Sequence, residues 1–504
     1  MSLQRNVRAA YLGQGWTALM GLAFIPVYIR YLGVEAWGLV GFMAMMQAWF
    51  ALLDMGLAPT LSREMARFSA GAHSAQSIRN LLRSLETVYV SVALSVVMIV
   101  WLAAPLLASQ WLQVERLPVQ EVAQAITLMG WVLAARMAEQ VYRGAILGLQ
   151  QLVWLNAAQS VLATLRWGGA VAVLAWVSPT VEAFFLWQGA VSVLTLAVFA
   201  VQTYRWLPRA PRAARFDLNE LRLVARYAGG MAVTTVLALL LTQVDKLLLS
   251  KLLPLDQFGY YTLAGSVSGA LYFLVGPLST AVAPRLTELV ARSDQATLVA
   301  TYHRASQWTA VFLIAPALVL ATFSERVLLA WSGEPALAQH AGPLLGVLAV
   351  GTMLNGFMQV PYMMQLAHGW TGLAVRLNAV AVVMIVPAIF WAVPRYGSLG
   401  AAWVWLVLNA FYVLVGIQFM HRSLLLREKW RWYRDTLVLP LLAGAAASGL
   451  AKLCWPPTGS RAIDALWLVG AAALTAAAVV AATPAPRHFL WLRLVELRGQ
   501  RAGA

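Results

Sequence analysis

Residues 87–114 read TVYVSVALSVVMIVWLAAPLLASQWLQV, a run of 28 residues without Asp, Glu, Lys or Arg. A second such run, ASQWTAVFLIAPALVLATFS, fills residues 305–324. A helix needs about 20 apolar residues to cross the hydrocarbon core of a bilayer, so each run can span a membrane. Of the 504 residues, 61% are hydrophobic and only 11% are charged, against about 25% charged in a soluble domain. The chain is therefore predicted to be an all-α integral membrane protein.

Charge clusters and Pro/Gly turns divide the chain into about fourteen apolar segments, each long enough to be a transmembrane helix. The even number predicts that both termini lie on the same side of the membrane. The segments cover residues 9–29, 36–58, 84–109, 120–144, 153–177, 181–203, 227–253, 259–284, 305–330, 341–366, 373–393, 398–420, 435–454 and 463–482.

Basic residues collect in alternate loops of this segmentation. Of the 36 Lys and Arg residues, 26 lie in the terminal arms and one set of connectors, and seven lie in the opposite loops. The remaining three, Arg136, Arg166 and Lys246, lie within predicted helices. Cytoplasmic loops are enriched in Lys and Arg, so both termini are predicted to be cytoplasmic. The formal net charge of +16 is then explained by topology, and no nucleic-acid partner is expected.

A short internal repeat occurs at an offset of 221 residues, with chance similarity of two turn sequences as the alternative. An offset of six helices preserves direction across the membrane, which predicts two parallel halves. The repeat pairs Arg30, Leu32, Val34, Glu35, Trp37 and Gly38 with Lys251, Leu253, Leu255, Asp256, Phe258 and Gly259.

The predicted organisation has two six-helix bundles and two C-terminal helices. The N-terminal bundle covers residues 1–203, and a basic cytoplasmic linker follows at 204–226. The C-terminal bundle covers residues 227–420, helices 13 and 14 cover 435–482, and a cytoplasmic tail covers 483–504.

Motifs for enzymatic chemistry are absent from the sequence. None of the four lysines lies in a Walker phosphate loop, and the six histidines form no H-E-x-x-H pattern. The lone cysteine, Cys454, cannot form an internal disulfide or a thiolate metal site. We therefore predict a protein that is not an enzyme, with no catalytic residues, no metal and no cofactor.

Ionisable residues within the predicted helices are the main functional candidates. Placing such a charge in a membrane span costs about 2.5–3.5 kcal/mol on insertion scales, and the group usually faces a bundle interior or a wet cavity. Arg166 lies near the middle of segment 5, where it either binds a ligand or forms a structural ion pair. Arg136, Glu139, Gln140 and Arg143 recur at i, i+3, i+4 and i+7 in segment 4. This polar stripe either lines a cavity or is paired internally.

Three further charged residues lie in or near predicted helices. Asp54 is near the inner end of segment 2. Asp245 and Lys246 are adjacent in segment 7, so on a helix we expect them to diverge by about 100° and to need different partners.

Several stretches resemble the bacterial polysaccharide-repeat-unit flippases. They are Arg30-Tyr-Leu-Gly-Val-Glu-Ala-Trp-Gly38, Leu53-Asp54-Met-Gly-Leu57, Arg63-Glu64, and Asp245 followed by Phe258-Gly259-Tyr260. This family comprises the O-antigen-type flippases of the multidrug/oligosaccharidyl-lipid/polysaccharide exporter superfamily. The motifs cover about residues 11–68 and 227–262. The resemblance implies fourteen helices in the bacterial inner membrane that translocate an undecaprenyl-pyrophosphate-linked oligosaccharide to the periplasmic leaflet by alternating access.

The resemblance also implies roles for the buried charges. Arg136 and Arg166 are expected to bind the pyrophosphate, with Arg143 and Lys246 as further substrate-binding residues. Asp54, Glu139 or Asp245 is expected to bind a proton or a sodium ion whose gradient drives the cycle. The expected partners are the lipid-linked oligosaccharide, the lipid bilayer, H+ or Na+, a polysaccharide polymerase and a chain-length regulator.

Other functions stay open at this point. Lipid II flippases carry basic residues in the central parts of helices 1 and 8, whereas residues 9–29 and 259–284 here contain no charge. The alternatives are a multidrug exporter of the same superfamily, a membrane polysaccharide polymerase or ligase, and a structural subunit of a polysaccharide assembly complex. The loops predicted outside are about ten residues or shorter, which disfavours a polymerase or ligase with a catalytic domain there.

Overall fold

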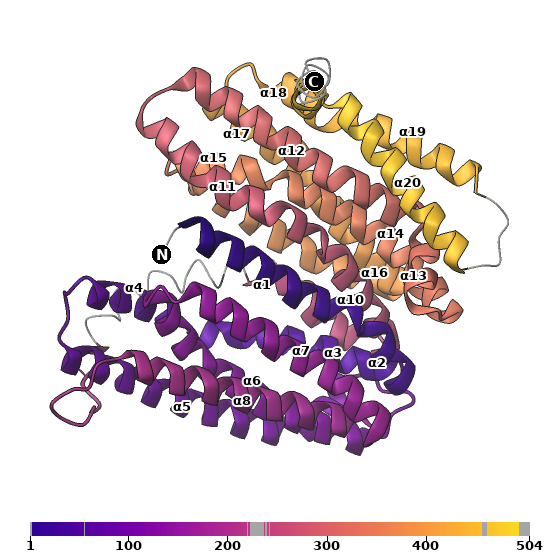
Figure 1. The fold of residues 1–504 in the computed structure, drawn as a ribbon. Coiled ribbons are helices and arrows are strands. Elements are labelled where there is room, and N and C mark those ends of the chain that lie inside the picture. Colours follow the sequence, from indigo (N-terminus) through magenta and orange to yellow (C-terminus); the bar gives the residue numbers. More distant parts are fainter. Residues whose placement is uncertain are drawn as a thin grey trace, which may run out of the picture. The chain divides into compact units, whose positions relative to one another are not determined.

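The computed structural model describes residues 3–54, 56–218, 220–221, 236, 239–240, 242–455 and 461–492, with side chains from residue 12 onward. This part of the chain is helical, with one isolated bridge between Gln113 and Pro254 and no other strand pairing. The predicted all-α membrane class is confirmed. The chain forms two compact units, Met1–Gly259 and Tyr260–Ala504 (Figure 1).

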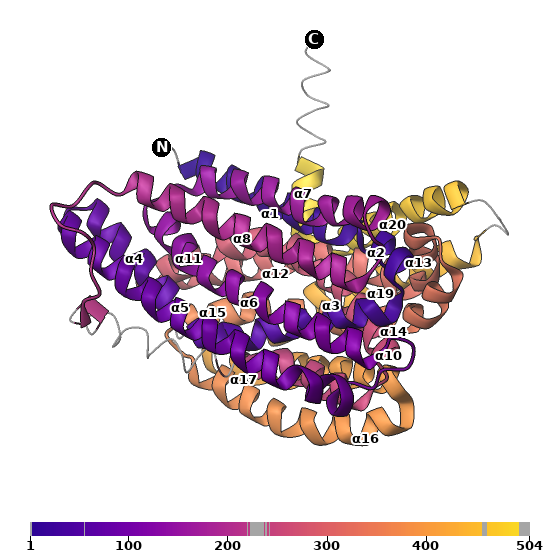
Figure 2. The same cartoon turned by 90° about the horizontal axis from the view of Figure 1, so that it is seen from below.

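Helix α6 (Val119–Gly148) is the central helix of unit 1, since it contacts five other helices. Figure 2 shows α6 beside α5 and α8. A further helix, α1 (Leu3–Ala23), continues into α2 (Ile25–Leu32) and packs against α7. The five neighbours of α6 are α3 (Val34–Phe50), α4 (Leu57–Ser69), α5 (Ala75–Leu106), α7 (Leu152–Trp176) and α8 (Val181–Trp206).

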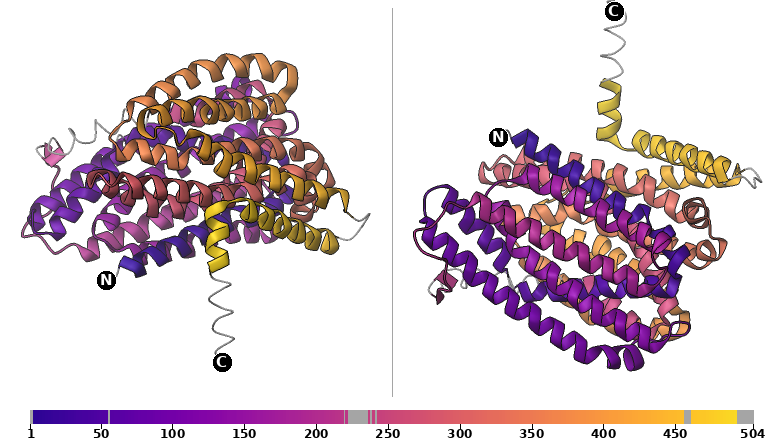
Figure 3. Two further views of the ribbon diagram at one scale, coloured as in Figure 1. Left: turned by 90° about the horizontal axis from the view of Figure 1, so that it is seen from above. Right: turned by 60° about the horizontal axis from the view of Figure 1, so that its bottom comes forward.

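In unit 2, α12 (Gln295–Thr322) and α14 (Pro335–Phe357) pack against each other and against most of the remaining helices. Two C-terminal helices, α19 (Leu439–Leu453) and α20 (Arg461–Ala482), lie side by side (Figure 3), and a further helical stretch follows at residues 484–492. The others are α11 (Leu271–Ala291), α13 (Ser324–Ser332), α15 (Gln359–Ala367), α16 (Gly372–Phe411), α17 (Ile417–Leu424) and α18 (Lys429–Trp432).

Eleven helical runs among the described residues are long and apolar enough to cross a membrane, which differs from the predicted fourteen in three places. The predicted helix 120–144 corresponds to α6, whose length suffices but which carries four charged residues and is not among the eleven. Predicted helix 227–253 is described only at residues 236, 239–240 and 242–253, and none of the eleven runs lies there. Predicted helices 373–393 and 398–420 form one run, Gly372–Leu424, with a kink at Gly397 where φ is 58°. The number fourteen and the bundle boundaries stay predictions.

The two copies of the sequence repeat contact each other within unit 1, where α10 (Leu255–Gly269) begins. A side chain at Gly38 would collide with the Leu255 carbonyl oxygen, and one at Gly259 would collide with the Val34 carbonyl oxygen. Val34 and Leu255 are equivalent at the offset of 221 residues, as are Gly38 and Gly259. Such reciprocal contacts arise where equivalent segments pack about a local twofold axis.

Close packing between α4 and α6 depends on small residues. A Cβ atom at Gly144 would lie 2.6 Å from the carbonyl oxygen of Ala58, and one at Gly148 would lie 2.6 Å from the Cβ of Met65. Small residues at four-residue spacing permit close approach of helices where no hydrophobic effect drives association. The Gly144-x-x-x-Gly148 pair therefore fixes the position of α4 on α6.

Replacing Gly144 with Leu is expected to lower the thermal unfolding midpoint of the detergent-solubilised protein, because overpacking costs about 1–3 kcal/mol. Gly470→Leu in α20 is the matched control, since a Cβ at Gly470 meets nothing within 4 Å. The midpoint is measured by light-scattering or tryptophan fluorescence. An equal fall in both variants would show that the α4–α6 contact has no special role.

The natural cysteine tests the predicted orientation. Cys454 is exposed at the end of α19, which the predicted topology places on the periplasmic side. A membrane-impermeant maleimide is expected to label it in cells whose inner membrane is intact. Arg212→Cys in a Cys454→Ser background is expected to react only after that membrane is permeabilised. The opposite pattern would mean that the orientation is inverted.

Candidate functional site

A cavity of about 690 Å³ lies within unit 1, among α3, α4, α5 and α6. Its walls combine apolar side chains with several of the charged residues that the sequence singles out. The polar side chains that line it are Gln47, Asp54, Ser62, Tyr89, Arg136, Gln140 and Arg143.

Arg136 reaches the cavity from α6 and is held by neutral side chains. Its Nη1 donates to Oε1 of Gln47 at 2.6 Å, and its Nη2 donates to Oε1 of Gln188 at 3.1 Å. The Nε atom lies 3.5 Å from Oγ of Ser192, which is buried in α8 together with Gln188. No carboxylate forms an ion pair with Arg136 among the described residues. Amide and hydroxyl oxygens accept three of its five N–H groups without cancelling its charge, so a positive charge stays at the cavity wall.

Arg143 lies two turns beyond Arg136 on the same helix and lines the same cavity. Within the described part of the chain it has no hydrogen-bonded or ion-paired partner. The carboxylate of Glu139 is buried near Arg166, Arg143 and Arg136, and within the described residues it forms no ion pair with any of them. The stripe predicted in segment 4 therefore presents two cations to the cavity and one acid beside it.

Arg166 is close to this group but does not line the cavity. It extends from α7, and its Nη2 donates to Oγ1 of Thr195 at 3.4 Å. Its Nε is buried without a hydrogen-bond partner among the described residues. Arg166 thus keeps an unused N–H donor near this group of charges.

Asp54 lines the cavity at the end of a 3-10 turn, Ala51–Asp54. Its Oδ1 accepts the hydroxyl of Tyr89 and also the backbone N–H of Ala58 at 3.2 Å, in the first turn of α4. A carboxylate at a helix N-terminus is stabilised by the helix dipole. Asp54 therefore fixes the start of α4 as well as adding a negative charge to the cavity.

Lys246 and Asp245 do not line this cavity. The Nζ of Lys246 lies 3.3 Å from both carboxylate oxygens of Asp245 and donates to the Thr242 carbonyl at 2.8 Å. The expectation that these neighbours need different partners is wrong for Lys246, because its flexible stem lets the ammonium group fold back to the preceding carboxylate. The pair is locally compensated.

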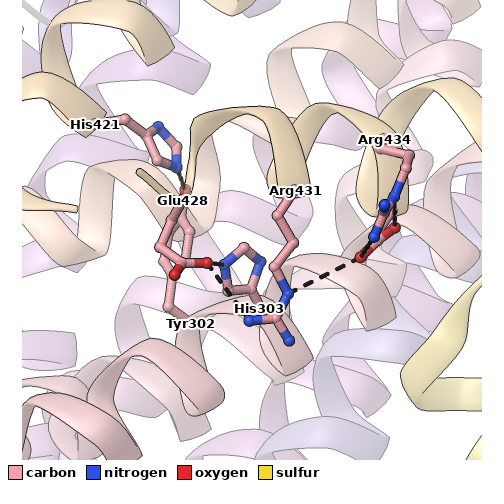
Figure 4. Close-up of polar contacts among 7 residues, drawn as sticks. Tyr302, His303, His421, Glu428, Arg431 and Arg434 are labelled. Carbon is pink, nitrogen blue, oxygen red and sulfur yellow. Dashed lines mark hydrogen bonds and ion pairs between the residues drawn. The ribbon is translucent and has the colours of Figure 1, made fainter. Parts of the chain in front are cut away.

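A second polar cluster lies in unit 2, with buried His303 and Asp435 and exposed arginines (Figure 4). Nε2 of His303, in α12, lies 2.7 Å from Oε2 of Glu428, and Nη1 of Arg431 lies 3.5 Å from the same oxygen. Arg434 donates to Asp435 at 2.7 Å through its Nε. Two acids and two arginines balance each other here, and the cluster joins α12 to the segment around α18. We interpret it as a structural tie between these elements.

Gln47, Gln188 and Tyr89 are not among the residues predicted from the sequence. An amide inside an apolar run is a signal that could have marked the two glutamines, whereas nothing near Tyr89 in the sequence indicates its bond to Asp54. No group of three or more His, Cys, Asp or Glu side chains in the described ranges could hold a metal ion.

Comparison with known proteins identifies relatives among membrane transporters. The chain is 18% identical to a putative O-antigen transporter of Shigella flexneri over 408 residues, which is 80% of this chain and 94% of that protein. Its fold is similar to the inward closed conformation of the lipid II flippase MurJ, with a TM-score of 0.71 at 13% identity over 94% of this chain and 98% of the other. It is also similar to an inward-facing multidrug resistance MATE family transporter of the MOP superfamily, with a TM-score of 0.62 at 14% identity over 84% and 95% of the two chains.

Each of these relatives is named as a transporter or a flippase and none as an enzyme, in agreement with the predicted class. A family model described as polysaccharide biosynthesis protein matches residues 3–290, more than half of the chain. The resemblance found in the sequence motifs is thereby confirmed, and this multi-pass membrane protein belongs to the polysaccharide biosynthesis protein family.

Proposed function

We propose that this protein is a flippase that moves an undecaprenyl-pyrophosphate-linked oligosaccharide from the cytoplasmic to the periplasmic leaflet of the bacterial inner membrane. The observation that carries the proposal is the cavity of unit 1, where Arg136 and Arg143 lie without carboxylate partners among the described residues. A pyrophosphate that leaves water needs such cations, because burying an unpaired charge is very unfavourable. Arginine binds phosphate oxygens through charge-assisted hydrogen bonds.

Arg136 is suited to this role by its remaining donors. Three of its N–H groups point to Gln47, Gln188 and Ser192, and a guanidinium has five such groups. The two that remain can bind phosphate oxygens while the glutamines hold the planar group in place. Arg143 supplies a second cation from the same helix face, and Arg166 adds positive charge nearby without lining the cavity.

We further propose that Glu139 binds the ion that couples transport to a gradient, by alternating access of the cavity to the two leaflets. Glu139 is buried in the field of three arginines, and none of them neutralises it at close range. Binding of a negative pyrophosphate to Arg136 and Arg143 weakens that field and favours uptake of a proton or a sodium ion at Glu139. Coupling of this kind is reciprocal, so ion binding at Glu139 strengthens the arginines as phosphate ligands and ion release weakens them. Asp54 and Asp245 stay as alternative candidates for the residue that binds the coupling ion.

Export of cationic drugs is the nearest competing function. The cavity contains two arginines and one aspartate at its wall, so its formal charge is positive. A positive cavity opposes cationic substrates and favours anionic ones. Accumulation of complete lipid-linked repeat units in the inner leaflet of a deletion strain supports the flippase, whereas changed drug resistance with normal polysaccharide supports the exporter.

Replacing Arg136 with Ala is expected to reduce flipping of the lipid-linked oligosaccharide about 10- to 100-fold, since a hydrogen bond to a charged group contributes about 1.5–3 kcal/mol. Arg136→Lys is expected to keep part of the activity, because lysine retains the charge but loses the planar fork. Flipping is measured as surface polysaccharide in a deletion strain, normalised to membrane protein level. Arg376→Ala, at an exposed arginine of α16, is the control. Full activity of both Arg136 variants at normal abundance would refute the assignment.

Replacing Glu139 with Gln keeps the shape of the side chain and removes its ionisable group. We expect the variant to bind lipid-linked substrate but to lose acceleration by an imposed proton or sodium gradient in proteoliposomes. Glu182→Gln, at an exposed position in the first turn of α8, is expected to respond to the gradient as the natural protein does. A Glu139→Gln protein that keeps its gradient response would transfer the coupling role to Asp54 or Asp245.

A further inference from the structure

A second cavity of unit 1, of about 910 Å³, opens where α8 ends and the chain returns toward α5. Figure 2 shows this segment leaving α8 and reaching the end of α5. Three arginines contribute to the wall: Arg79 from α5, Arg205 from the last turn of α8, and Arg209 from the segment that follows. The cavity shares no lining residue with the one that contains Arg136.

Arg79 is held rigidly at this site. Its Nε donates to the Pro208 carbonyl at 2.8 Å, and its Nη2 donates to the Leu207 carbonyl at 3.1 Å. Its guanidinium also lies over the Tyr204 ring, with 5.7 Å between Cζ and the ring centroid. Carbonyl oxygens and an aromatic face fix the group without removing its charge. A fixed cation loses less conformational entropy when it binds an anion.

The charge of this cavity is not neutralised within the described residues. Arg79, Arg205 and Arg209 form no ion pair there, and Arg205 and Arg209 are exposed. The acid nearest in the hydrogen-bond network is Glu86, which is already engaged. It accepts hydrogen bonds from the hydroxyls of Tyr204 at 2.7 Å and Tyr142 at 2.9 Å, and it forms an ion pair with Arg83 at 3.1 Å.

Apart from the arginines and Tyr204, the wall is apolar and is formed by Ala200, Val201, Leu207 and Pro208. Val201 belongs to α8, one of the runs apolar enough to cross a membrane, and its side chain is 51% exposed. Cations therefore sit at the end of a membrane-spanning helix, directly beside apolar surface. A soluble phosphate would use only the cations, whereas a membrane lipid would use both kinds of surface.

We propose that this cavity binds an anionic phospholipid, with its phosphate between Arg79, Arg205 and Arg209 and an acyl chain along Ala200 and Val201. Basic pockets between transmembrane helices at the cytoplasmic side are suited to anionic headgroups, and the arginine-rich loops place this end of unit 1 on that side in the predicted topology. An acyl chain gains little by moving from bilayer to an apolar protein surface, so the arginines provide the selectivity over neutral lipids. The proposal does not depend on which substrate the protein transports.

Native mass spectrometry of the full chain, with phosphatidylglycerol or phosphatidylcholine added to the detergent-solubilised protein, tests this site. Arg205→Gln/Arg209→Gln is expected to weaken phosphatidylglycerol binding at least tenfold and to leave phosphatidylcholine binding unchanged. The matched control, Arg212→Gln/Arg215→Gln, removes the same charge from the same connecting segment outside the cavity, and less than a twofold change is expected. Equal loss in the two double variants would reduce the effect to general electrostatics and overturn the proposal, as would no loss in either.

The apolar wall is tested separately, with arginines intact. Val201→Trp is expected to lower phosphatidylglycerol binding at least threefold, because the larger ring occupies the place of the acyl chain. Val193→Trp, on the same helix and 58% exposed but outside the cavity, is the control. Competition experiments identify the source of the phosphate. Displacement of phosphatidylglycerol by an equal concentration of inorganic phosphate would indicate a soluble anion. Displacement by an equal concentration of undecaprenyl phosphate would indicate the isoprenoid carrier. Either result would overturn the phospholipid assignment, and resistance to both supports it.

Discussion

The guanidinium of Arg136 needs polar partners inside an apolar bundle, and the arrangement of unit 1 follows from how it obtains them. Its partners come from α3 and α8, so α6 must pack between those helices. On the next face of α6, Gly144 admits the backbone of α4 at Ala58. The N–H of Ala58 in turn holds Asp54 at the cavity. The close helix contact thereby sets the distance between the acid and the arginine.

Much of this architecture is encoded locally and could be predicted. Apolar runs predict the helices, and the polar residues from Arg136 to Arg143 predict the polar face of α6. Both predictions are possible because helical periodicity depends only on residues close together in the sequence. The partners of Arg136 could not be predicted, since Gln47 and Gln188 are 89 and 52 residues away. Lys246 pairs with Asp245 although their Cβ atoms diverge on a helix, because the long lysine side chain reaches back to the preceding carboxylate.

The two arginine-lined cavities of unit 1 differ in how their charge is maintained. Arg136 is inside the bundle, where amide groups replace water and a counterion is lacking among the described residues. Arg79 lies at a helix end, where carbonyls and an aromatic ring orient it and Arg205 and Arg209 stay exposed. Placing a charge inside the bundle costs free energy, which favours a functional role for Arg136. Arginines at the membrane interface can instead serve to set the orientation of the helices in the membrane. The features that distinguish the proposed lipid site from an ordinary cytoplasmic helix end are therefore its cavity and the fixed guanidinium of Arg79.

The carboxylates of unit 1 differ in what their hydrogen bonds support. Asp54 holds Tyr89 and the first turn of α4, so a change in its charge would disturb the packing that shapes the cavity. Asp245 is compensated by Lys246. Glu139 has no close ion pair within the described residues, although the arginine field reaches it. A group that gains and loses an ion in each cycle must change charge without dismantling helix contacts, and by this criterion Glu139 is the best suited of the three.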